Sequence, residues 1–208
     1  LMKRPMGKLP PKGLVIGGIN YGTPAEGEGK WNPLPGTLVE AQRISEQLKS
    51  RFSSLKLLID TNATEDAFRS QLATSNVVHL ATHGFFGGRV DRQTGGFDVL
   101  DLTQEMDSAI VLAGANLSAG GSDELLTAAE LAEMDLCHIR LLVLSACQTG
   151  LGHVRAGQGL VGLLGALARS GVQSTVSSLW EVNDEATAQL MIEFYAAAVR
   201  DPSPLCLA

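Results

Sequence analysis

Short runs of apolar residues alternate along the chain with segments whose apolar residues recur every three or four positions. The runs predict six β-strands: Leu14–Ile19, Leu55–Ile59, Val77–Thr82, Ala109–Leu112, Leu141–Ala146 and Ser174–Trp180. Most of them lack the apolar–polar alternation of a strand with one solvent-facing side, so helices are expected on both faces of the sheet. Strands and helices in alternation predict an α/β fold, a three-layer α/β/α sandwich with a mostly parallel sheet.

The helices between these strands are marked by capping residues at their starts. Thr37 and Glu40 have the spacing of a capping box, and Thr127 and Glu130 have it again. Thr64 is placed to cap a third helix, and the last helix is expected to start at Asn183. The apolar faces expected against the sheet are Leu38, Ala41, Ile44 and Leu48 in the first helix, and Thr187, Leu190, Met191, Phe194, Tyr195 and Ala198 in the last.

Two segments, Gly87–Asp107 and Ala113–Glu124, have no clear period and are expected to be long loops. The first is rich in glycine and charged residues, and two interpretations stay open for it: a mobile wall of a cleft, or a passive insertion. The chain shows neither an internal repeat nor a second core. Residues 1–13 are therefore expected to be a linker or tail, and residues 14–208 to form one domain.

Composition narrows the possible function classes. The chain has 208 residues, of which 45% are hydrophobic and 18% charged, which is ample for a packed core. Its net charge of −6, without a basic run, makes nucleic acid an unexpected partner, and no apolar stretch has the length of a membrane span. The cysteines, Cys137, Cys147 and Cys206, form neither a disulfide framework nor a CxxC motif, so a reducing cytosol is expected.

Chemically capable residues follow two of the predicted strands. His83 and Gly84 follow Val77–Thr82, and Cys147 follows Leu141–Ala146. Ligands of parallel sheets bind at the carboxyl ends of strands, so a thiol and an imidazole face each other there if the two strands are neighbours. Such a pair can form the thiolate nucleophile of a cysteine peptidase. From the residues alone the bland interpretation stays open, in which Cys147 is a small core residue and His83 a hydrogen-bonded structural one.

Other candidate sites are weaker. His79 and His83 are four residues apart, which is a metal-ligand spacing on a helix but not on the predicted strand, so no metal is expected. Residues 157–162 match G-x-G-x-x-G, but the tight strand–turn–helix of a nucleotide site is missing, and helix packing is expected instead. Cys137 is expected to be packed in the core.

Four motifs together resemble the CHAT family, the caspase-like domain associated with tetratricopeptide repeats. They are Leu34-Pro35-Gly36, VVHLATHGFF (77–86), LLVLSACQTGLG (141–152) and SLWEVNDEAT (178–187) followed by MIEFYAAA. The resemblance implies a caspase-like fold, with Cys147 as nucleophile and His83 as general base and acid. It also implies a cytoplasmic peptidase of prokaryotic signalling or defence, with a tetratricopeptide-repeat region in the same or another chain. Family members continue with a further helix and strand, and here the sequence stops at DPSPLCLA, where that helix would begin.

The sequence thus predicts a cysteine endopeptidase that cleaves protein or peptide substrates and requires no cofactor. The backbone N–H groups of Gly84 and Cys147 are expected to hold the oxyanion. Trp180, Glu181 and Asp184 come after the strand 174–180, at the same edge of the sheet, and are expected to line the substrate pocket. Since that segment has carboxylates and no arginine, the residue before the cut is expected to be basic or uncharged. The alternative is a catalytically inactive protein-interaction module.

Overall fold

A computed structural model of the chain describes residues 11–23, 31–86, 108–117, 124–148, 158–178 and 183–200. The elements are β1 (Lys12–Ile19), α1 (Pro35–Leu48), β2 (Ser54–Asp60), α2 (Glu65–Leu72), β3 (Val77–Phe86), β4 (Ser108–Val111), β5 (Leu125–Thr127), α3 (Ala128–Glu133), β6 (Leu141–Gln148), α4 (Gln158–Arg169), β7 (Thr175–Ser177) and α5 (Asp184–Arg200). None of the helices in these ranges combines the length and the hydrophobicity that a membrane span requires.

The described strands form one sheet of seven strands, against six expected, and the sheet is mostly parallel, as the sequence predicts. Strands β2, β1, β3, β6 and β7 pair in parallel in that order, and β4 and β5 add an antiparallel extension to the end of β3. Gly84 pairs with Ile110 of β4 and with Gln148 of β6. Strand β1 pairs with the first half of β3, and β4 pairs with the last residues of β3 on the same side. The residues that follow β1 and those that follow β4 therefore meet beside the end of β3.

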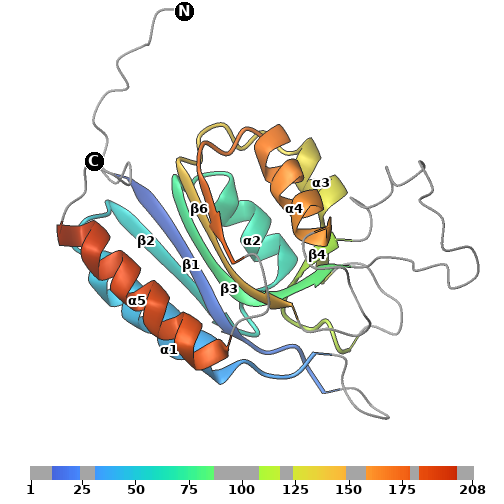
Figure 1. Ribbon diagram of the computed structural model, residues 1–208, viewed down its shortest axis with the longest axis horizontal. Helices are drawn as coiled ribbons and strands as arrows, with labels where there is room; N and C mark the ends of the chain where they lie inside the picture. The colour runs from blue at the N-terminus through green and yellow to red at the C-terminus, as the bar shows by residue number, and fades with distance from the viewer. Residues whose placement is uncertain are drawn as a thin grey trace, which may run out of the picture.

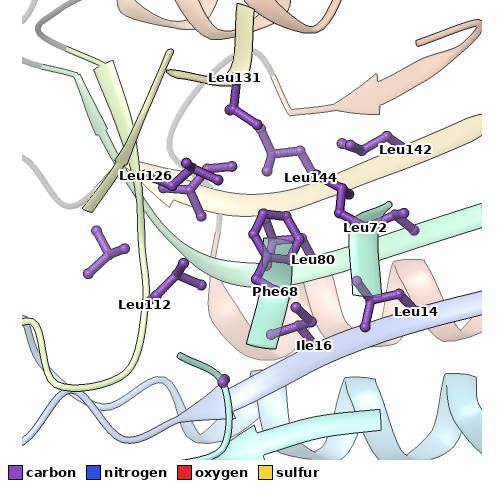
Figure 2. Packing of buried hydrophobic residues seen from close by; sticks show 14 of the residues in the cluster. Leu14, Ile16, Phe68, Leu72, Leu80, Leu112, Leu126, Leu131, Leu142 and Leu144 are labelled. Atoms are coloured by element: carbon purple, nitrogen blue, oxygen red, sulfur yellow. The ribbon is translucent and has the colours of Figure 1, made fainter. Parts of the chain in front are cut away.

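Helices cover both faces of the sheet, which makes the three-layer sandwich expected from the apolar strands (Figure 1). Helices α1 and α5 lie side by side on one face, and α2, α3 and α4 cover the other. On the second face Phe68 and Leu72 of α2 pack against the strand residues Leu14, Ile16 and Leu80 (Figure 2). Full burial of such a side chain stabilises the fold by about 1.5–3 kcal/mol, so these contacts hold the layers together.

The core under α1 and α5 is smaller and contains two ionisable side chains. Its apolar part includes Val15 of β1, Ile44 of α1 and Tyr195 of α5. Glu40 of α1 and His79 of β3 are buried beside them. The carboxylate Oε1 of Glu40 lies 3.0 Å from Nε2 of His79, so an acid and a base from two layers meet inside this core.

The capping box expected at Thr37 and Glu40 is wrong. Helix α1 begins at Pro35, and the hydroxyl of Thr37 donates to the carbonyl of Leu34 and accepts from the N–H of Gly18. Glu40 is turned into the core towards His79. Thr37 therefore binds the end of β1 and Glu40 lies against β3, so neither side chain caps the helix. The cap at Thr64 and the capping box of Thr127 and Glu130 are confirmed.

Strand ends and surface positions also differ from expectation. Strands β3 and β6 continue past the predicted ends, so His83 and Cys147 lie within strands, and the three-residue strand β5 has no counterpart in the predicted set. Leu190, expected on the buried face of the last helix, is 62% exposed, because α5 turns Ala188 and Tyr195 towards the sheet. Cys137, expected in the core, is exposed because its neighbours Leu136 and Ile139 fill the core there.

Candidate active site

Strands β3 and β6 bring His83 and Cys147 to the same level of the sheet. The two strands pair in parallel from Val77 with Leu141 onwards, and in this register His83 is the partner of Cys147. Neighbouring strands lie about 4.8 Å apart, so the backbones of the two candidate residues are adjacent. The condition for the Cys–His hypothesis, that the two strands be neighbours, is therefore met.

The imidazole of His83 is buried, contacts two aromatic rings and is fixed by a backbone carbonyl. The ring of Tyr21 has its centroid 5.0 Å away and that of Trp31 5.5 Å away. Nε2 of His83 lies 2.7 Å from the carbonyl oxygen of Asn32. A carbonyl only accepts hydrogen bonds, so Nε2 carries the proton, and in the neutral ring Nδ1 is the basic nitrogen.

The surroundings of His83 keep its ring neutral. Burial lowers the pKa of His83 because the charged imidazolium loses hydration. The carbonyl of Asn32 and the negative charge of Asp184 act in the opposite direction and offset part of this effect. A neutral imidazole at pH 7 is the form that a general base requires.

Tyr21 is held by its own hydroxyl. The Tyr21 hydroxyl lies 2.9 Å from Oγ1 of Thr82, and the Thr82 hydroxyl donates to the carbonyl of Val111 at 2.6 Å. Because the one hydroxyl proton of Thr82 is used there, Tyr21 is the donor to Thr82. Burial raises the pKa of Tyr21 to about 12, so the phenol stays neutral and positions the ring against His83.

Asp184, the first residue of α5, is bound to the start of α1. Its Oδ2 accepts a hydrogen bond of 2.7 Å from the N–H of Gly36. A Cβ atom at Gly36 would lie 2.7 Å from the same carboxylate, so only glycine allows this approach. The charge of Asp184 acts on both His83 and Tyr21, which places this carboxylate near the candidate site. Trp180 and Glu181 lie outside the described residues, and the substrate pocket expected from the three stays a prediction.

Gly84 lies within β3, between β4 and β6. Its expected role with Cys147 as oxyanion donor stays a prediction. The loop 87–107, expected to be a cleft wall, lies outside the described residues, as does the first glycine of the G-x-G-x-x-G match.

Sequence reasoning missed the residues that surround His83. Tyr21 is the second residue after the first strand, and the rule that sites form at carboxyl ends of strands, applied to every strand, points to it. Trp31 and the Asn32 carbonyl lie before α1, far from any strand end that carries a nucleophile or base. The sequence gives no signal for these two.

Comparison with known proteins identifies the family of the chain. A family profile for the CHAT domain matches residues 4–205, nearly the whole chain. No curated protein matches the sequence. The profile spans all the described elements, including the strands that pair His83 with Cys147 and the helices on both faces of the sheet. The chain therefore belongs to the CHAT domain family, whose members are caspase-like, peptidase-related domains.

Proposed function

We propose that this domain is a cysteine endopeptidase in which Cys147 is the nucleophile and His83 the general base and acid. The observation that supports this most directly is the register of β3 and β6, which makes His83 and Cys147 neighbours. The Asn32 carbonyl adds to it, because it keeps the proton on Nε2 of His83 and leaves Nδ1 as the base.

The reaction follows from these roles. Nδ1 of His83 takes the proton of the Cys147 thiol, and the thiolate attacks the carbonyl carbon of the peptide bond. The imidazolium then protonates the leaving amine, the C–N bond breaks, and an acyl-enzyme remains. His83, neutral again, takes a proton from water, whose oxygen attacks the thioester. Protonation of the departing Cys147 sulfur by the imidazolium completes hydrolysis without a cofactor.

Two further parts of the proposal concern binding. The N–H groups of Gly84 and Cys147 hold the oxyanion of the tetrahedral intermediate. Trp180, Glu181 and Asp184 line the pocket for the residue before the cut, which is basic or uncharged. The substrates are proteins or peptides of a prokaryotic signalling or defence pathway in the cytoplasm, and a tetratricopeptide-repeat region controls access to the site.

A peptide-library cleavage assay tests the reaction itself. Cleavage by the unmodified chain should be lost in Cys147→Ala, and His83→Ala should lower the rate by ~10²–10⁴-fold while the chain stays folded. His138→Ala is a matched control, because Nε2 of His138 also contacts a backbone carbonyl, that of Leu72 at 3.0 Å, before β6 begins. Retained cleavage in His83→Ala with a lowered melting temperature would assign His83 a structural role instead.

Thiol labelling tests the pair without a known substrate. Cys137 is exposed and could react with the label as well. Asp135 raises the pKa of the Cys137 thiol, which slows that reaction but does not prevent it. Labelling is therefore best followed in a Cys137→Ser and Cys206→Ser background. An acyl-type peptide inhibitor should then modify Cys147 stoichiometrically, and His83→Ala should abolish the modification. Equal labelling with and without His83 would contradict the proposed pair.

The pocket is tested with fluorogenic peptides that differ only in the residue before the cut. We expect Arg, Lys or an uncharged residue to be preferred over Asp. Asp184→Asn and Glu181→Gln should weaken any preference for a basic residue. Preferred cleavage after Asp would refute the pocket assignment and leave the nucleophile and base untouched.

A further inference from the structure

Asn116 hydrogen-bonds two chain segments that are distant from it in sequence. Its Oδ1 accepts from the N–H of Trp31 at 2.9 Å, and its Nδ2 donates to the carbonyls of Trp31 and Gly22 at 2.8 and 3.0 Å. Its own backbone N–H donates to the carbonyl of Tyr21 at 2.7 Å. Asn116 thus joins the chain that leaves β1 to the chain that enters α1.

These two segments carry the groups that surround His83. Tyr21 and Trp31 supply the two aromatic rings that contact the imidazole, and Asn32, the residue after Trp31, supplies the carbonyl that contacts Nε2. Asn116 hydrogen-bonds the backbone of Tyr21 and of Trp31, and Asn32 is the residue after Trp31. A displacement of Asn116 would therefore move the surroundings of His83 directly.

The turn that carries Asn116 is itself firmly placed. The N–H of Gly114 donates to the carbonyl of Asn20 at 3.1 Å, and that of Ala113 to the carbonyl of Ala63 at 3.0 Å. Gly22 has a φ of +82°, and the side chain of Leu117 occupies the space where a Cβ of Gly22 would lie. Asn116 is therefore a fixed point from which the segments around His83 are held.

Only an amide fits this pattern of one accepted and two donated hydrogen bonds. The side chain of asparagine offers one carbonyl oxygen and two N–H donors, and here all three face backbone groups. An aspartate has the same shape but would place a carboxylate oxygen against the carbonyls of Trp31 and Gly22. Asn116→Asp thus turns the two donated hydrogen bonds into repulsion between acceptor oxygens, with almost no change in side-chain volume.

We propose that Asn116 is a positioning residue for His83. It holds the Asn32 carbonyl on Nε2, which keeps Nδ1 as the unprotonated nitrogen. The consequence for catalysis rests on the proposed peptidase function, whereas the consequence for the state of the His83 ring does not. Asn116 acts through backbone groups and has no contact with the reacting atoms.

The experiment compares Asn116→Asp and Asn116→Ala with the unmodified chain. Asn76→Asp is a matched control: Asn76 also bridges two segments, with Oδ1 accepting from Lys12 at 3.1 Å and Nδ2 donating to the His138 carbonyl at 3.2 Å, at the strand starts, away from His83. The first measurement is the ¹⁵N NMR spectrum of the histidine side chains, with the His83 signals assigned by their loss in His83→Gln. The second is kcat and KM for peptide cleavage.

In the unmodified chain and in Asn76→Asp, His83 should be a single Nε2–H tautomer at neutral pH. In both Asn116 variants its nitrogen signals should move towards a mixture of tautomers. A displacement of about 1 Å can cost on the order of 10²-fold in rate, so kcat should fall by roughly 10–10²-fold with little change in KM. Asn116→Ala creates no repulsion between acceptors, and it carries the test if Asn116→Asp does not fold.

The outcomes separate the two proposals. An unchanged His83 tautomer in a folded Asn116 variant overturns the positioning role. A changed tautomer together with the absence of cleavage by the unmodified chain supports the positioning role and counts against the peptidase. Equal changes in Asn76→Asp would show a general loss of stability and overturn the specific assignment to Asn116.

Discussion

The buried contact between Glu40 and His79 is expected to respond differently to single and to double replacement. Oε1 of Glu40 lies 3.0 Å from Nε2 of His79, and both side chains are 1% exposed. Among the described residues, none gives either carboxylate oxygen of Glu40 a well-aligned hydrogen bond. Tyr195 of α5 packs beside this pair, with its ring edge-on to His79 and its hydroxyl buried. Burial raises the pKa of Tyr195, and the charge of Glu40 raises it further, so Tyr195 contributes no opposite charge.

Glu40→Leu and His79→Leu should each destabilise the fold by about 3–5 kcal/mol, because each leaves one polar partner buried alone. For a chain of this size about 1 kcal/mol corresponds to roughly 2–4 °C, so each melting temperature should fall by at least about 6 °C. The double variant should recover most or all of this loss, since an apolar pair of similar volume needs neither hydration nor a partner.

Urea and thermal unfolding of the unmodified chain, the two single variants and the double variant at pH 7 measure this coupling. Arg43→Ala is the control on the same helix: its ion pair with Glu46 spans 3.8 Å between side chains that are 65% and 72% exposed, and its loss should change little. Single variants that stay within about 1 kcal/mol of the unmodified chain would refute the reasoning. So would a double variant whose loss equals the sum of the single losses, because independent sites add within about 0.5 kcal/mol.

Two more predictions concern the α1–α5 contact and the pH dependence of stability. Gly36→Ala should lower the stability by about 1–3 kcal/mol, because its Cβ would lie 2.7 Å from the Asp184 carboxylate. A Cβ at Gly165 in α4 would meet, among the described residues, only the end of the Arg169 side chain at 3.8 Å, so Gly165→Ala should raise stability by about 0.5–1 kcal/mol. Thermal unfolding measures both variants, and melting temperatures that change in the same direction would contradict the argument. Since burial lowers the pKa of His83, its contribution to stability is complete above the unfolded value of about 6.5 and is lost as the pH falls below it. His83→Gln removes this dependence, so as the pH falls from 7.5 to 5.5 the melting temperature of the unmodified chain should decrease more than that of His83→Gln. A difference between the two melting temperatures that does not change with pH would argue against a buried neutral His83.

Two identical local patterns show how far the sequence determines this fold. Thr127 and Glu130 form the capping box that their spacing predicts. In the part of the chain that the structure describes, the further polar contact of these side chains is Arg69 with Oε1 of Glu130, which leaves Oε2 to the cap. Thr37 and Glu40 have the same spacing, but the hydroxyl serves Gly18 and the carboxylate lies against His79. The difference comes from residues of β1 and β3, which a pattern of four residues does not contain.

The sequence by itself determined the layers and the parallel sheet, because burial on both faces requires continuous apolar runs and each helix requires a periodic apolar face. It also placed His83 and Cys147 at the ends of apolar strands. Only the tertiary structure decided their register and what holds the imidazole. The Asn32 carbonyl is 51 residues from His83, and Asn116 is 85 residues from Trp31. Every residue has a backbone carbonyl, so no residue type marks the one that contacts a histidine; the folded path of the chain alone selects it.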